Sequence, residues 1–132
     1  MRVLTDFEGA WQFDREITHA DGTVARARGM AQFTPDNDGL AYRETGEIDV
    51  NGQVLTFERA YQWQADLSVH FDDGRYFHAV PPNGGQATHF CDPDTYVVTY
   101  DFVGWPTWIA KWAVSGPKKD YVMQTRYSPV SA

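Results

Sequence analysis

Apolar and polar residues alternate along most of the chain, and turn-forming segments interrupt the alternation about every ten residues. A period of two is typical of β-strands, because successive side chains on a strand point to opposite faces of the sheet. Glycine, asparagine, aspartate and proline supply the turns in ADGT, TPDNDG, VNGQ, DDGR, PPNGG and SGPKK. The pattern predicts ten strands, at residues 9–19, 23–34, 39–49, 53–65, 67–72, 75–80, 86–92, 95–104, 107–115 and 120–128.

The chain of 132 residues has the length of one domain, spanning residues 1–132, with a single core. No long segment has a helical period, so only the first few residues are expected to form a short helical or extended lead-in. Many short strands joined by tight turns form a meander, which at this length closes or splits into two sheets. We therefore predict an all-β fold, a single antiparallel meander barrel of about eight to ten strands.

The charge balance excludes several classes of partner. Eighteen Asp and Glu oppose eleven Lys and Arg, for a net charge of -7, so neither nucleic acid nor an anionic membrane surface is an expected partner. No apolar run approaches the roughly 20 residues of a membrane-spanning helix. The N-terminus lacks the apolar run of a signal peptide, and the single cysteine, Cys91, suits a reducing compartment, so we expect a cytoplasmic protein.

A carboxylate occupies the apolar face of one predicted strand. In the stretch GLAYRETGEI, Glu44 shares its parity with Leu40 and Tyr42. A buried charge is costly unless it is paired or hydrated. Arg15 and Arg59 also lie on the apolar faces of nearby predicted strands, so we expect these two cations to accompany Glu44 inside the barrel.

Two interpretations of this charged group remain open. In one, it belongs to a polar cavity with a positive bias; in the other, it is a buried Arg–Glu–Arg network that sets the register of the strands. Barrels of eight or more strands commonly hold ligands, which favours the cavity. Aromatic residues of the same inward parity are then the candidates to contact a ligand: Tyr42, Tyr61, Tyr96, Tyr100 and Trp112.

Two histidines share the inward face of the predicted strands after the midpoint of the chain. A tight turn in DDGR places Phe71 opposite Tyr76, and a tight turn in PPNGG places His78 opposite His89 and Tyr76 opposite Cys91. Such histidines can transfer protons, hydrogen-bond a ligand, bind a metal or fill the edge of the core. Because the chain has no HExxH or paired CxxC motif, no metal is expected, and His78 with His89 is only a minor metal alternative.

The segment FEGAWQFDREI, together with Arg126 in MQTRYSP, resembles the calycin pattern of lipocalins and fatty-acid-binding proteins. In that pattern a GxW tryptophan of the first strand packs against an arginine of the last strand. The resemblance therefore implies that Arg126 covers Trp11. Haem-binding relatives of this architecture take an axial histidine from a late strand. The chain has no histidine after His89, so no cofactor is expected.

Five further segments resemble a family of small bacterial proteins of unknown function. They are GLAYRE, DGRYFH, HFCDPDTY, YDFVGWPTW and GPKKDY, and the resemblance runs over nearly the whole chain. It implies a calycin-like barrel and supplies no activity.

These observations favour a barrel, monomeric or homodimeric, that binds a small molecule of anionic or partly aromatic character. Arg15 and Arg59 are expected to engage an acid group. The first alternative is a cofactor-independent enzyme, an acid–base isomerase, dehydratase, decarboxylase or hydrolase, whose candidate groups are Glu44, His78, His89 and Tyr100. The second alternative is an interaction protein that binds a partner chain on its outer face.

Overall fold

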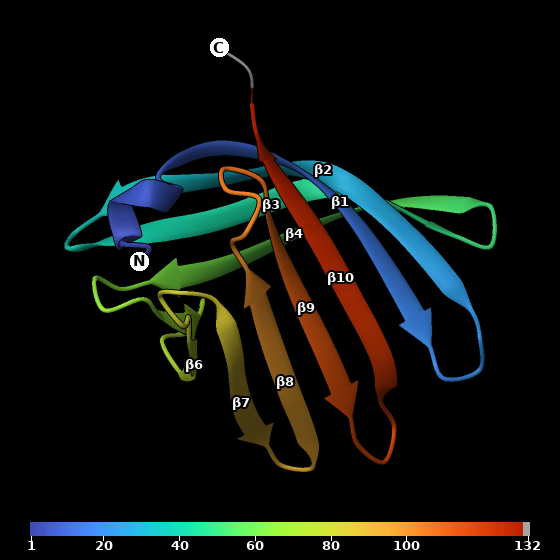
Figure 1. Ribbon diagram of the computed structural model, residues 1–132. Helices are drawn as coiled ribbons and strands as arrows, with labels where there is room; N and C mark the ends of the chain where they lie inside the picture. The colour runs from blue at the N-terminus through green and yellow to red at the C-terminus, as the bar shows by residue number, and fades with distance from the viewer. Residues whose placement is uncertain (131–132) are drawn as a thin grey trace.

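The computed structural model describes residues 1–130, which form one antiparallel sheet rolled into a nearly closed barrel (Figure 1). A short 3-10 helix, η1 (Leu4–Phe7), precedes the sheet. No helix of the described chain is long and apolar enough to cross a membrane. The strands are β1 (Gly9–His19), β2 (Val24–Asp36), β3 (Gly39–Val50), β4 (Gln53–Trp63), β5 (Ser68–Phe71), β6 (Tyr76–Ala79), β7 (Gly85–Cys91), β8 (Asp94–Asp101), β9 (Trp108–Ser115) and β10 (Asp120–Pro129).

The meander predicted from the turns is confirmed, and each strand begins and ends within three residues of its predicted bounds. The order across the sheet is β6-β5-β4-β3-β2-β1-β10-β9-β8-β7, so each strand neighbours the next along the chain and β1 joins β10. The two edges, β6 and β7, pack together without a shared ladder. The hydrogen-bonded wall is therefore interrupted between β6 and β7, and we call this side the open side of the barrel.

One end of the barrel is sealed by aromatic rings. Phe7 of η1 is fully buried, and its ring centre lies 5.1 Å from that of Trp63 and 5.3 Å from those of Trp105 and Trp108. The indole N–H of Trp11 donates to the carbonyl oxygen of Phe7 at 2.8 Å, which ties η1 to β1. This end is a dry core, stabilised by burial of large apolar surface and by ring–ring contacts.

The predicted packing of Arg126 on Trp11 is wrong. Trp11 lies opposite Pro129 in the β1–β10 ladder, whereas Arg126 lies opposite Asp14 and is exposed. Trp11 is buried and is covered by Trp105, with the ring centres 5.7 Å apart. The physical reason is the pleat: Arg126 has the outward parity of β10, so its side chain leaves the barrel wall on the solvent side.

The sheet makes a close backbone approach where Gly29 of β2 pairs with Gly46 of β3. A Cβ atom added to Gly29 would lie 2.1 Å from the carbonyl oxygen of Thr45, and one on Gly46 would lie 2.4 Å from that of Arg28. Glycine inside a strand commonly marks such an approach or a barrel corner. The wall can therefore bend here only because neither residue carries a side chain.

We expect Gly29→Ala to lower the free energy of unfolding by about 1–3 kcal/mol, the usual cost of overpacking. Urea denaturation followed by tryptophan fluorescence measures the change. Gly104→Ala is the matched control, because the nearest atom to an added Cβ at that position is 3.5 Å away. Equal losses in the two variants would contradict the close approach of β2 and β3.

Candidate functional site

Arg15 and Glu44 form a buried, two-pronged ion pair. Arg15 Nη1 donates to Oε2 of Glu44 at 2.6 Å and Nη2 donates to Oε1 at 2.9 Å. The two side chains are 3% and 1% exposed. They belong to β1 and β3, and between them the inward residues of β2 are the small Ala27 and Ala31, which lie opposite Arg15 and Glu44 respectively. Small residues on β2 leave the space through which Arg15 reaches Glu44.

Two tyrosines complete the surroundings of Glu44. The Tyr42 hydroxyl donates to Oε1 of Glu44 at 2.5 Å and lies 2.9 Å from the Tyr127 hydroxyl. Because the Tyr42 proton is used on the carboxylate, Tyr127 donates to Tyr42. Burial by itself raises the pKa of Glu44, but the hydrogen bonds and charge of Arg15, with the charge of Arg59, outweigh burial and hold that pKa below its ordinary value. Glu44 therefore stays ionised and already accepts three hydrogen bonds.

Arg59 lies opposite Glu44 in the β3–β4 ladder but does not form an ion pair with it. Within the described chain no carboxylate oxygen lies within 4.0 Å of its guanidinium. Its hydrogen bonds go to the Tyr61 hydroxyl and, at 3.8 Å, to the sulfur of Met123, and it lies 4.9 Å from the ring centre of Trp112. A guanidinium has five N–H donors, so Arg59 keeps donors for a further partner.

His78 and Tyr100 form a neutral pair inside the barrel. Nε2 of His78 lies 2.8 Å from the Tyr100 hydroxyl. Burial lowers the pKa of His78 to about 4, with a smaller contribution from the charge of His89, and burial raises the pKa of Tyr100 well above its ordinary value. Both groups are therefore uncharged at neutral pH.

The predicted cross-strand pairing of His78 with His89 is wrong. β6 and β7 do not form a ladder, and His89 lies opposite Tyr96 of β8. The reason is the position of the turn in the loop between them. The backbone N–H of Gly84 donates to the carbonyl oxygen of Pro81 at 3.0 Å, so the turn is centred on Pro82 and Asn83 rather than on Asn83 and Gly84, and the carbonyl oxygen of Pro82 accepts from the backbone N–H of Arg2 at 2.7 Å. The two histidines still meet on one ring, because Phe77 lies 4.4 Å from His78 and 5.4 Å from His89 between ring centres.

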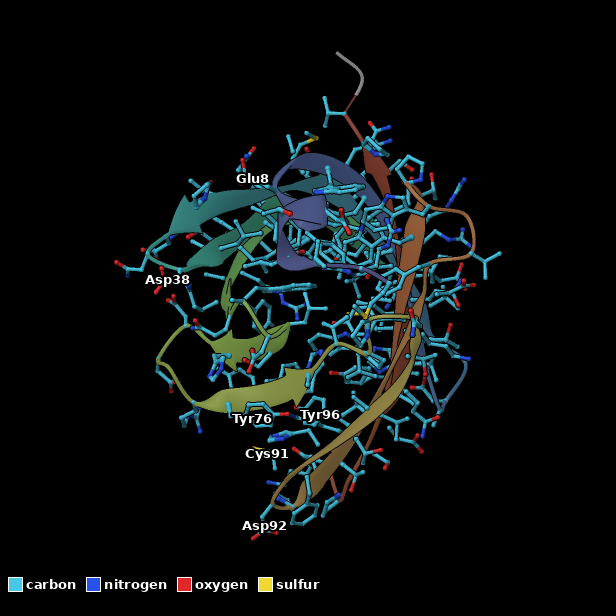
Figure 2. The ribbon with its side chains drawn as sticks, turned by 60° about the vertical axis from the view of Figure 1, so that its left-hand side comes forward. Glu8, Asp38, Tyr76, Cys91, Asp92 and Tyr96 are labelled. Carbon is cyan, nitrogen blue, oxygen red and sulfur yellow. The ribbon has the colours of Figure 1, made fainter. Side chains whose placement is uncertain are left out.

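The predicted face that joined Phe71, Tyr76 and Cys91 is also wrong. A register shift after Val69 in the β5–β6 ladder places Tyr76 opposite His70 instead of Phe71, and Tyr76 is 53% exposed. Cys91 is exposed and lies opposite Asp94, and Figure 2 shows it near the tip of the β7–β8 hairpin. A thiol in that position does not reach the interior.

The ten candidate ligand-binding residues fall into two zones. Five are buried: Arg15, Tyr42, Glu44, His78 and Tyr100. Five are half-buried: Arg59, Tyr61, His89, Tyr96 and Trp112. We call the second group the rim, because its members come from β4, β7, β8 and β9 and flank the open side of the barrel. The buried group lies behind the rim.

An internal cavity of about 30 Å³ links the two zones. A water molecule needs roughly 10–15 Å³ of such volume, whereas pockets for drug-sized ligands measure roughly 300–1,000 Å³. The cavity therefore has room for a small polar group rather than for a whole ligand. Its lining includes Arg59 and His78 together with Trp108, Thr125 and Tyr127.

The sequence analysis did not select several residues of this lining. The alternation along β9 and β10 could have identified three of them, because their side chains have inward parity: Trp108, Thr125 and Tyr127. Thr125 accepts a hydrogen bond from Nε of Arg15 at 2.7 Å. No sequence signal marked Phe77, since β6 buries two successive residues, Phe77 and His78, and thereby breaks the alternation.

A larger depression of about 670 Å³ lies outside the barrel, over β1, β2, β3, β9 and β10. Besides Arg15, which is paired with Glu44 inside the wall, four cations and four acids line it, so its outward charge is balanced: Arg26, Arg28, Lys111, Arg126, Asp14, Glu16, Glu47 and Asp49. Arg26 and Glu16 pair with each other at 3.2 Å and are exposed. This surface has the character of a solvated sheet face, and the interior is the better candidate site.

Among residues 1–130, no group of three or more histidine, cysteine, aspartate or glutamate side chains is arranged to hold a metal ion. His78 and His89 both contact the ring of Phe77, whereas the thiol of Cys91 is exposed and does not lie with them. The two histidines alone supply too few ligands for a structural zinc site, which takes four.

Comparison with known protein families identifies the family of this chain. The model of a family of unknown function, DUF6314, matches residues 7–129. The chain belongs to this family. No curated protein matches this DUF6314 member in sequence. Its fold is similar to that of the S-type phycobiliprotein lyase from Guillardia theta, with a TM-score of 0.67 and 9% identity over 98% of this chain and 91% of the lyase chain. The two proteins share the calycin-like barrel.

We expect Glu44→Gln to lower the free energy of unfolding by about 3–5 kcal/mol, because Arg15 would remain buried without its counter-ion. Urea denaturation at neutral pH measures the loss. Glu58→Gln is the matched control, since Glu58 pairs with Arg43 at 3.1 Å on the exposed outer face. The control should lose less than about 1 kcal/mol. A small loss in both variants would show that the buried pair is dispensable for stability.

We expect the stability contribution of His78 to depend on pH. Its pKa is about 4 in the folded protein against 6.5 for the free side chain, so between these values only the unfolded chain takes up the proton. The contribution is complete above pH 6.5 and is lost as the pH falls toward 4, by about 3 kcal/mol in all. Denaturation midpoints of the parent and His78→Gln across this range should converge as the pH falls. Parallel profiles would contradict a buried, neutral His78, and the exposed His19→Gln serves as control.

Proposed function

We propose that this DUF6314 protein binds a small anionic molecule with a partly aromatic body, and that Arg59 holds its acid group. The observation that carries the proposal is that one inward arginine has a carboxylate partner and the other has none. Arg15 is neutralised by both oxygens of Glu44, whereas Arg59 faces the cavity without a carboxylate of its own. A half-buried guanidinium with free donors is suited to a carboxylate, which it can bind through two parallel hydrogen bonds.

The rim supplies surfaces for an aromatic body. Trp112 lies between the rings of Tyr61 and Tyr96, with ring centres 6.4 Å and 6.2 Å away, and Arg59 sits over its face. These rings are half-buried, so each keeps surface that a ligand can cover. Flat aromatic groups gain both buried area and ring–ring contact at such a surface.

The volume of the cavity sets how the ligand enters. About 30 Å³ accommodates a carboxylate or a carbonyl but not a ring. The proposed arrangement therefore has the polar head of the ligand in the cavity and its body against the rim. The fold shared with a phycobiliprotein lyase is compatible with a barrel that receives a ligand from its open side.

Binding is better supported than acid–base catalysis. Glu44 is engaged by three donors and its pKa is lowered, so it is a poor general base. His78 has a pKa of about 4 and Tyr100 a raised pKa, so at neutral pH the first is a weak base and the second a weak acid. These groups are better suited to orienting a ligand than to moving a proton.

We expect small aromatic carboxylates such as phenylacetate to raise the melting temperature of the parent protein. A ligand at 100 times its Kd adds about 2.7 kcal/mol of stability, which corresponds to several degrees. Arg59→Gln should abolish the rise. Arg43→Gln is the matched control and should retain it, because this substitution removes the same charge from the outer face of the adjacent strand. The proposal is wrong if no small carboxylate shifts the parent or if Arg59→Gln responds as the parent does.

A further inference from the structure

Two residues that line the cavity each have a buried nitrogen atom without a hydrogen-bond partner. The two atoms are Nε1 of Trp108 and Nδ1 of His78, whose side chains belong to residues that are 1% and 2% exposed. They are the side-chain polar atoms of this kind within the described chain. Buried polar groups in folded proteins are nearly always hydrogen-bonded, so each such atom calls for an explanation.

Both nitrogen atoms are donors. An indole nitrogen carries a hydrogen and can only donate. The neutral His78 ring carries one hydrogen, and its Nε2 lies against the Tyr100 hydroxyl. If the Tyr100 hydroxyl donates to Nε2, the hydrogen of His78 is on Nδ1, and this N–H is the one group of the pair without a partner. If Nε2 donates instead, the Tyr100 proton and the Nδ1 lone pair are both left over. The first arrangement leaves fewer unsatisfied groups and is the one expected.

The carboxylate acceptor of the cavity lining is already engaged. Among the described residues that line the cavity, Glu44 supplies the carboxylate oxygens, and these accept from Arg15 and Tyr42. The lining includes no other carboxylate and no side-chain amide. The lining thus combines this engaged carboxylate with three residues that have unused donors, Arg59, His78 and Trp108.

We propose that the cavity contains a second polar subsite, formed by Trp108 Nε1 and His78 Nδ1, that recognises a carbonyl oxygen. The ligand class is then an aromatic oxo acid, with its carboxylate at Arg59 and its carbonyl oxygen at the two N–H groups. This inference rests on the proposed function for its carboxylate contact. A carbonyl oxygen has two lone pairs and no hydrogen, so one such oxygen can accept from two N–H groups.

The same chemistry predicts an order of preference among matched acids. A hydroxyl group in the subsite accepts from the donors but brings a hydrogen for which the lining has no free carboxylate or amide acceptor. A methylene group leaves both donors unsatisfied. Sites built around buried polar groups reject analogues that leave these groups unpaired. The expected order of affinity is therefore oxo acid, hydroxy acid, then unsubstituted acid.

Phenylglyoxylate, mandelate and phenylacetate test this order, because they share a ring, a chain length and a carboxylate and differ only at one carbon. Isothermal titration calorimetry should give a Kd for phenylglyoxylate about ten-fold or more below that for phenylacetate, with mandelate between them. Trp108→Phe should reduce the ratio of the phenylacetate Kd to the phenylglyoxylate Kd. Trp105→Phe is the matched control, because Trp105 belongs to the sealed end and does not line the cavity.

A second measurement needs no variant and covers the case in which Trp108→Phe does not fold. In the parent protein, phenylglyoxylate should shift the indole N–H resonance of Trp108 downfield, and phenylacetate should leave it in place. The resonance of Trp11 is the internal reference, because its N–H already donates to the carbonyl oxygen of Phe7.

The outcomes separate the two proposals. If all three acids bind with equal affinity and Arg59→Gln weakens them equally, the carboxylate site stands and the carbonyl subsite is overturned. If none of them binds, both proposals fall. Preference for phenylglyoxylate that survives in Trp108→Phe, with an unmoved Trp108 resonance in the parent, overturns the assignment of the subsite to this residue.

Discussion

The ion pair between Arg15 and Glu44 is the constraint on which the interior depends. Two charges that are almost fully buried are tolerable only when each is matched by the other and by further hydrogen bonds. Tyr42 and Thr125 supply these bonds, and Tyr127 supports Tyr42. The pair bridges β1 and β3 across β2, so it couples three strands of the wall. By taking every oxygen of Glu44, it also leaves the second inward arginine without a counter-ion.

The barrel is divided into a dry end and a polar, open side, and the division follows from the chain ends and the edges of the sheet. Phe7 of η1 fills one end with aromatic contacts and leaves no polar cavity there. The two edges, β6 and β7, meet without a ladder, and the half-buried rim lies along that side. A ligand is therefore expected to approach Arg59 past Tyr61 and Trp112, not through the sealed end.

The sequence predicted which charged residues face the interior, but its pairing of the two histidines was wrong. Arg15 and Glu44 lie on stretches of β1 and β3 where burial alternates from residue to residue, so parity placed them inward. Arg59 shares the parity of Tyr61 and Trp63 on β4, although burial does not alternate along that strand. His78 and His89 were paired through a turn assumed at Asn83 and Gly84, whereas the β5–β6 ladder shifts its register and the loop turns one residue earlier, at Pro82 and Asn83. Parity is informative while a ladder is regular and loses its meaning at a bulged edge strand.

The sequence by itself determined the number and order of the strands and the inward face of most of them, because alternation and turn chemistry are local properties of the chain. Only the tertiary structure decided which inward polar groups are satisfied. Glu44 is closer to Arg15, two strands away, than to its direct neighbour Arg59, and Nε1 of Trp108 and Nδ1 of His78 have no hydrogen-bond partner. Such choices depend on how far the closed sheet curves and where its small residues leave space, which no local pattern records.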